Sequence, residues 1–192
     1  MSTPSLLRRS PLLTLRHKTK PRASCEFTAI LAGGLAYNDK VGFGLCGAGA
    51  NCGFTQFVGM PFTPRSNATV MQVRVAVQYN SGTNQVNLSL YNDVGGVPGT
   101  VLAGPVTVAN LPSGGTCCTL AIANFESGVA VTAGVQYWVV ANMPASGPGS
   151  DFNGAWDFLF PTASFGIDTG TGWFSSIGDL MGAAGAVLGT IP

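Results

Sequence analysis

The side chains that could carry out chemistry are few in this chain, and acids are the most numerous of them. The sequence has eight Asp and Glu residues but one histidine, His17, which lies in a basic segment at the start of the chain. Without a histidine in the rest of the chain, neither Ser-His-Asp nor Cys-His catalysis is expected there. A pair of carboxylates across a groove, as in glycoside hydrolases, is the remaining catalytic option. Most of the acids stand beside Gly, Asn or Ser, where short side chains cap turns, so we predict that the protein is not an enzyme.

Oxygen-rich stretches offer a possible metal site. Carboxylate and amide oxygens are the ligands that Ca²⁺ prefers, but no stretch has the complete ligand spacing of an EF-hand loop. We therefore predict no required cofactor and keep Ca²⁺ as the alternative. Its candidate ligands are Asp93, Asp151, Asn153 and Asp157.

Aromatic side chains offer a second kind of site, because planar rings can stack on the faces of sugars while their polar atoms stay hydrated. The candidates are Tyr91, Trp156 and Trp173, and Trp173 stands in the loop-like setting Thr169-Gly-Thr-Gly-Trp-Phe174. The alternative for each tryptophan is packing in the core. For Trp138, in the apolar run Tyr137-Trp-Val-Val140, we predict the core.

The five cysteines indicate an oxidising compartment. Cys46 and Cys52 flank the short flexible segment Gly-Ala-Gly-Ala-Asn, and we predict a disulfide between them. Cys117 and Cys118 are adjacent, so they form either a vicinal disulfide in a distorted turn or two unrelated thiols. The spacing of these four cysteines does not suit tetrahedral zinc. Disulfides predict a secreted or periplasmic protein.

The elements that must position these residues have a period of two. Val86, Leu88 and Leu90 alternate with polar residues, as expected for strands with one buried face. Turn sequences such as Asn80-Ser-Gly-Thr-Asn84 separate the apolar runs. We predict a single all-β domain, a jelly-roll-like antiparallel β-sandwich of about 8–10 strands. The predicted strands are Phe54–Phe62, Val73–Tyr79, Gln85–Leu90, Thr100–Val108, Cys118–Ile122, Val129–Val131, Val135–Ala141, Ala155–Phe160 and Ala184–Leu188, with Val73–Val77 and Val135–Val140 innermost. The three glycines of Ile177–Leu188 argue against a helix there.

Charge divides the chain into a leader, residues 1–26, and the sandwich domain, residues 27–192. Residues 1–24 hold six of the nine Lys and Arg residues and no acid. This leader is either an export or transit segment, a disordered tail, or the product of a wrongly assigned start. The domain has no basic patch, so nucleic-acid binding is not expected. No apolar run is long enough for a transmembrane helix.

Several motifs together resemble a known family. These are the turn Asp93-Val-Gly-Gly-Val-Pro-Gly99, the strand Gly134-Val-Gln-Tyr-Trp138 and the segment Gly154-Ala-Trp-Asp157. They resemble the bacterial choice-of-anchor R domain proteins, secreted β-sandwich proteins that often carry a sorting tail of the PEP-CTERM type. The chain ends after its last predicted strand without such a tail, which favours release over anchoring. The resemblance implies no activity and no site residues.

These observations predict a non-enzymatic secreted or extracellular protein that associates with a surface, a matrix or other cells. The alternative is a carbohydrate-binding module that uses Tyr91, Trp156 and Trp173, with or without Ca²⁺. In either case the expected partner is a polysaccharide or an extracellular matrix.

Overall fold

The computed structural model describes residues 25–27, 37–116, 119–159, 163–178 and 182–192, and all its regular structure is β-strand. The predicted all-β class is therefore confirmed. The described part holds fourteen strands, more than the 8–10 expected. They are β1 (Cys25–Phe27), β2 (Asn38–Cys46), β3 (Phe57–Phe62), β4 (Ala68–Val75), β5 (Val77–Ser81), β6 (Gln85–Val94), β7 (Val97–Ala109), β8 (Ala121–Val131), β9 (Tyr137–Asn142), β10 (Asn153–Leu159), β11 (Ala163–Asp168), β12 (Trp173–Gly178), β13 (Gly182–Ala183) and β14 (Gly185–Thr190).

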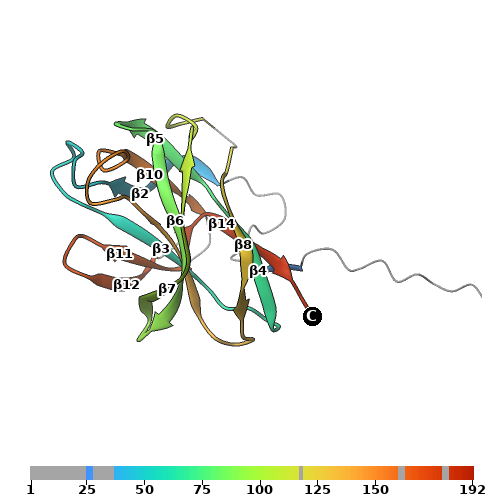
Figure 1. Ribbon diagram of the computed structural model, residues 1–192. Helices are drawn as coiled ribbons and strands as arrows, with labels where there is room; N and C mark the ends of the chain where they lie inside the picture. The colour runs from blue at the N-terminus through green and yellow to red at the C-terminus, as the bar shows by residue number, and fades with distance from the viewer. Residues whose placement is uncertain (1–24, 28–36, 117–118, 160–162, 179–181) are drawn as a thin grey trace, which may run out of the picture.

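The strands pair antiparallel in three sheets that pack as a β-sandwich (Figure 1). One sheet has six strands in the order β12-β11-β3-β9-β6-β7. A second has four, in the order β1-β14-β4-β8. The third has the order β13-β10-β2, and β5 also pairs with β10.

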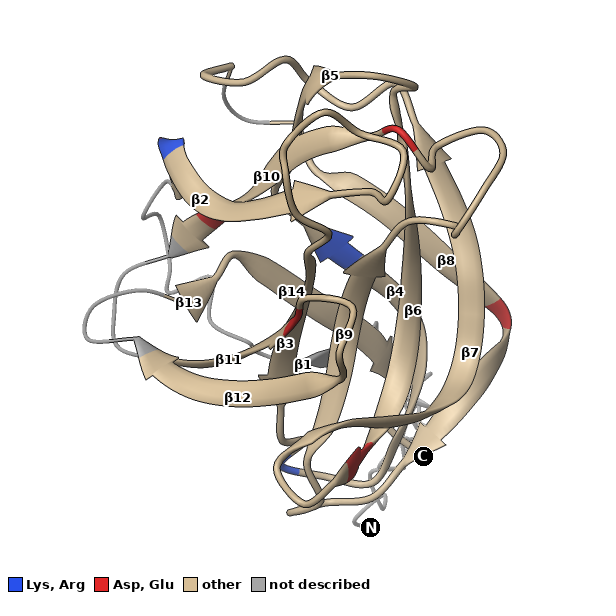
Figure 2. Ribbon diagram, turned by 90° about the vertical axis from the view of Figure 1, so that its left-hand side faces the viewer, with Lys and Arg blue, Asp and Glu red and all other residues tan. Residues whose placement is uncertain are grey.

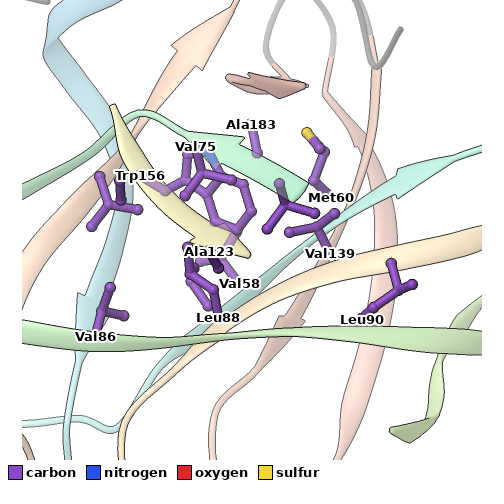
Figure 3. Close-up of a cluster of buried hydrophobic side chains, with 14 of the residues drawn as sticks. Val58, Met60, Val75, Val86, Leu88, Leu90, Ala123, Val139, Trp156 and Ala183 are labelled. Atoms are coloured by element: carbon purple, nitrogen blue, oxygen red, sulfur yellow. The ribbon is translucent and has the colours of Figure 1, made fainter. Parts of the chain in front are cut away.

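The core lies between these sheets and follows the alternation of the sequence. Leu88 and Leu90 of β6 and Val139 of β9 point inward and are fully buried. They meet Val75 of β4 and Ala123 of β8 from the opposite sheet (Figure 3). The two runs predicted to be innermost are confirmed, because β4 lies between β14 and β8 and β9 lies between β3 and β6.

Several strand boundaries differ from the predictions. The run Val129–Val131 and the last two residues of the run Cys118–Ile122 belong to one long strand, β8, whereas Thr119 and Leu120 lie outside it. The strands β2, β11 and β12 were not predicted, because glycine and serine interrupt their apolar pattern. The described part of Ile177–Leu188 is strand and not helix, in agreement with its glycine content.

The Cys46–Cys52 disulfide is confirmed, with Cα atoms 6.5 Å apart. Cys117 and Cys118 lie outside the described residues, as does the leader up to residue 24. Residues 25–27 pair with β14, so the sheet begins within the last residues assigned to the leader. Among the described residues, no helix is long and apolar enough to cross a membrane.

Candidate ligand-binding face

The six-stranded sheet has one face turned to the core and one turned away from it. In β9, Tyr137, Val139 and Ala141 belong to the core cluster, so Trp138, between them, points to the outer side. Trp138 is nevertheless completely buried. Other groups on the outer side must therefore cover its indole.

Two glycines make room for that covering. Gly59 of β3 and Gly166 of β11 are directly opposite each other, and the missing side chains would both point outward. A Cβ atom added at Gly166 would lie 3.1 Å from Trp138 Cζ3 and 3.4 Å from Trp173 Cε3. One added at Gly59 would lie 3.2 Å from Trp138 and from the ring of Pro98. The rings of Trp138, Trp173 and Pro98 thus gather over a floor of bare backbone.

Trp173 is the first residue of β12 and is partly exposed. It is paired with Asp168, the last residue of β11. The Asp168 carboxylate accepts hydrogen bonds from the backbone N–H groups of Gly170 (2.8 Å) and Gly172 (3.1 Å). These bonds hold the turn that delivers Trp173 to the sheet, with both glycines at positive φ.

Trp138 is anchored by Asp93 of β6. Its indole Nε1 donates to Asp93 Oδ1 at 2.7 Å, and the Gln136 amide donates to the same oxygen at 2.7 Å. The backbone N–H of Gly96 donates to the other oxygen at 3.0 Å. Burial acts to raise the pKa of Asp93, but these three hydrogen bonds together hold it below its ordinary value. Asp93 is therefore ionised at neutral pH.

Tyr91 completes the group of aromatic residues. It is partly exposed and pairs with Trp138 across β6 and β9, so its side chain is also on the outer side. Burial raises the pKa of its hydroxyl, against the effect of a hydrogen bond with the Asn142 side chain, and the carboxylate of Asp168 raises it further. We call the outer side of the six-stranded sheet, with Tyr91, Trp138 and Trp173, the aromatic face.

A hollow of about 520 Å³ opens on the aromatic face. We call it the serine hollow, because three of its seven lining residues are serines. Its lining residues are Gly96, Gln136, Trp138, Ser164, Ser175, Ser176 and Ile177. A larger groove of about 580 Å³ lies elsewhere, between β7 and β8, and has no tryptophan or tyrosine in its lining.

The structure brings Tyr91 and Trp173 onto one face, but it buries Trp156 in the core. Trp156 has no exposed surface, and its indole N–H donates to the Ala184 carbonyl at 2.8 Å. The hypothesis that Trp156 stacks on a sugar is therefore wrong, and the alternative of core packing is correct. Trp138 is buried as predicted, but on the side of its sheet that faces away from the core cluster.

The four candidate calcium ligands do not converge. Asp93 holds Trp138 in the six-stranded sheet, whereas Asn153 and Asp157 lie on β10 and are about 13 Å apart along that strand. Asp151 accepts from the backbone N–H of Thr83 at 3.1 Å. In the described part of the chain, no three His, Cys, Asp or Glu residues are grouped as metal ligands. Calcium binding by any of these residues stays a prediction.

Asp157 occupies a different kind of position, which the sequence did not indicate. It is 1% exposed, and its carboxylate accepts from the Gln78 amide at 2.7 Å. The same amide donates to the Asp39 carbonyl, and its oxygen accepts from the backbone of Gly115. Burial raises the pKa of Asp157 to about 7, with the Gln78 hydrogen bond opposing this and the charge of Asp39 adding to it.

Comparison of the chain with models of known protein families, with curated proteins and with solved structures gives no match. The resemblance to choice-of-anchor R domain proteins stays a prediction.

Proposed function

We propose that the protein is a non-enzymatic polysaccharide-binding module that acts outside the cytoplasm, and that the aromatic face is its binding surface. One observation carries the proposal: Tyr91 and Trp173 are partly exposed on the same side of one sheet, around a third ring that the fold fixes in place. A partly exposed ring backed by rigid structure presents apolar area at little entropic cost.

The surroundings of the two rings support the proposal. Trp173 lies against the glycine floor, so the sheet holds the indole from one side. Polar groups stand next to it, with Asp168 opposite in the strand pair and the serine hollow beside it. Binding sites for small or chain-like ligands combine apolar area with a few placed hydrogen-bonding groups in this way.

The compartment is supported by the disulfide. The Cys46–Cys52 bond closes a loop whose cysteines would stay reduced in most cytoplasms. An extracellular location also gives a glycan-binding face access to cell-wall or matrix polysaccharides.

Affinity electrophoresis on gels that contain soluble cellulose derivatives, β-1,3-glucan, xylan or mannan tests the proposal. We expect retardation by at least one polysaccharide, and loss of most of that retardation in Trp173→Ala. Phe174→Ala is the matched control, because Phe174 is the next residue in β12, is 49% exposed and points to the other side of the strand.

Two results would contradict the proposal. One is no retardation on any polysaccharide, with calcium or with a chelator. The other is equal loss of retardation in both variants, which would place the contact outside the aromatic face.

A further inference from the structure

We infer that the aromatic face and the serine hollow form one continuous site whose ligand is an uncharged polysaccharide and not a uronate or sulfated one. The inference rests on the proposed function and adds the chemical class of the ligand. Its basis is the sequence of groups along β12, the chemistry of the hollow and the distribution of charge around both.

The continuity follows from the strand register. Trp173 and Ser175 are on the same side of β12, about 7 Å apart along the strand, and Ser175 pairs with Gly166 of the glycine floor. Ile177 and its partner Ser164 come next on the same side, and both line the hollow. A chain of sugar rings that stacks on Trp173 therefore reaches the hollow with its neighbouring ring.

The lining of the hollow suits hydroxyl groups. Ser164 and Ser175 point to this side of their strands, and each has a hydroxyl that can donate one hydrogen bond and accept two. A sugar hydroxyl has the same capacity, so either partner can supply the hydrogen. Among the residues that the structure describes, no charged side chain lines the hollow.

Two carboxylates border this site. Asp93 binds the side chains of Gln136 and Trp138, which both line the hollow, and Asp168 pairs with Trp173. An anionic sugar on the aromatic face would be repelled by both of them. The repulsion is largest at low ionic strength, since charges farther apart than about 10 Å are screened at 0.1 M salt.

None of the three described Lys and Arg residues lines the hollow or shares a hydrogen bond with Asp93 or Asp168. The three described Lys and Arg residues are separated in the fold, with Lys40 on β2, Arg65 in the β3–β4 loop and Arg74 on β4 (Figure 2). Anionic polysaccharides need a cationic partner such as an arginine, whose guanidinium pairs with carboxylates. The site therefore selects uncharged chains.

The experiment compares polymers that differ only at C6, where the hydroxymethyl group is replaced by a carboxylate. Soluble cellulose, β-1,3-glucan and mannan are each tested beside the same polymer oxidised at C6 to the uronate, by titration calorimetry at 10 mM and 300 mM salt. We expect the uncharged form to bind roughly tenfold more tightly at 10 mM salt and the difference to shrink at 300 mM.

Ser175→Lys provides the second arm, because it adds a cation to the hollow without removing an aromatic ring. We expect it to remove most of the preference for the uncharged polymer. Ser127→Lys on β8 is the control, since it adds the same charge at an exposed serine outside the serine hollow and should leave the preference unchanged. Circular dichroism in the near ultraviolet checks that both variants keep their aromatic packing.

The outcomes separate the two proposals. Equal or tighter binding of an oxidised polymer, still dependent on Trp173, overturns the preference for uncharged chains and leaves the aromatic face as the binding surface. Binding of neither form of any polymer overturns both. A preference that Ser175→Lys and Ser127→Lys reduce equally reflects net charge alone and overturns the role of the hollow.

Discussion

Replacing Asp157 with asparagine should stabilise the protein at alkaline pH and leave it nearly unchanged at pH 4. The Asp157 side chain is almost completely buried, and asparagine has the shape and the neutral charge of its protonated form. The asparagine oxygen can still accept the hydrogen bond from Gln78. The substitution therefore removes the cost of a buried charge and keeps the packing.

The direction in which stability changes with pH follows from the direction of the pKa shift. The pKa of Asp157 rises from 3.8 in the unfolded chain to about 7 in the folded protein, so the folded state holds its proton more tightly between these values. The contribution of the protonated acid to stability is complete below pH 4 and is lost as pH rises toward 7. Above pH 7 the charged carboxylate stays buried, and the loss is constant.

The magnitude follows from the same two values. Each pH unit between these two pKa values lowers the free energy of unfolding by about 1.4 kcal/mol, so the total loss is at most about 4 kcal/mol. The pKa of about 7 already includes the Gln78 hydrogen bond, but the buried NH₂ group of the asparagine replaces a hydroxyl and offsets part of the gain. We expect the free energy of unfolding of Asp157→Asn to exceed that of the parent protein by roughly 2–3 kcal/mol at pH 8 and by less than about 0.5 kcal/mol at pH 4.

Urea unfolding followed by tryptophan fluorescence at pH 4, 6 and 8 measures this difference. Asp151→Asn is the control of opposite sign, because hydrogen bonds from Thr83 lower the pKa of Asp151. That variant should be no more stable than the parent at pH 8. If the difference in unfolding free energy between Asp157→Asn and the parent is the same at pH 4 and pH 8, Asp157 is not a buried acid of raised pKa.

Two further predictions concern the glycine floor and the cysteines. Gly166→Ala places a Cβ atom 3.1 Å from the buried Trp138 ring, so we expect it to lower the free energy of unfolding by about 1 kcal/mol and to weaken polysaccharide binding. Gly44→Ala, whose nearest new contact is 3.6 Å, should not destabilise, and equal effects in the two urea curves would contradict the described packing. Thiol titration of the denatured, unreduced full chain should detect at most one free thiol among the five cysteines, and three or more would show that Cys46–Cys52 is the sole disulfide or is absent.

The sequence was sufficient for the class of the fold because two of its inner strands carry a clear apolar pattern. In β6, Val86, Leu88 and Leu90 alternate with polar residues, and such a pattern can bury one side only as a strand. In β9, the run Tyr137–Ala141 is apolar throughout and is buried on both sides. In β2, glycines at positions 42 and 44 stand where a strand pattern needs larger side chains. The close approach of β10 explains one of them, since a Cβ at Gly42 would lie 2.4 Å from the Trp156 carbonyl oxygen. Such a reason is visible only when both strands are in place.

The candidate site was predictable only in part, for a similar reason. Trp156 and Trp173 both follow small residues, and nothing within a few residues of either tells which is buried. The environment of Trp156 comes from residue 184, and that of Trp173 from Gly59 and Gly166. Ala184 is 28 residues from Trp156, and Gly59 is more than 100 residues from Trp173. The local signal that was available is the turn Asp168-Thr-Gly-Thr-Gly172, whose acid and glycines hold the loop before Trp173.

Several of the few acids in the described part of the chain hold neighbouring groups of the protein by hydrogen bonds. Asp93 holds the indole of Trp138, Asp151 holds the backbone at Thr83, and Asp168 holds the turn before Trp173. Each of these carboxylates is engaged by hydrogen bonds within the protein. The groups left for a ligand on the aromatic face are therefore ring faces, hydroxyls and amides. A surface of that composition matches an uncharged sugar chain better than any ionic partner. Ser175→Lys tests this match, because it adds one cation to the face and should remove most of the preference for uncharged chains.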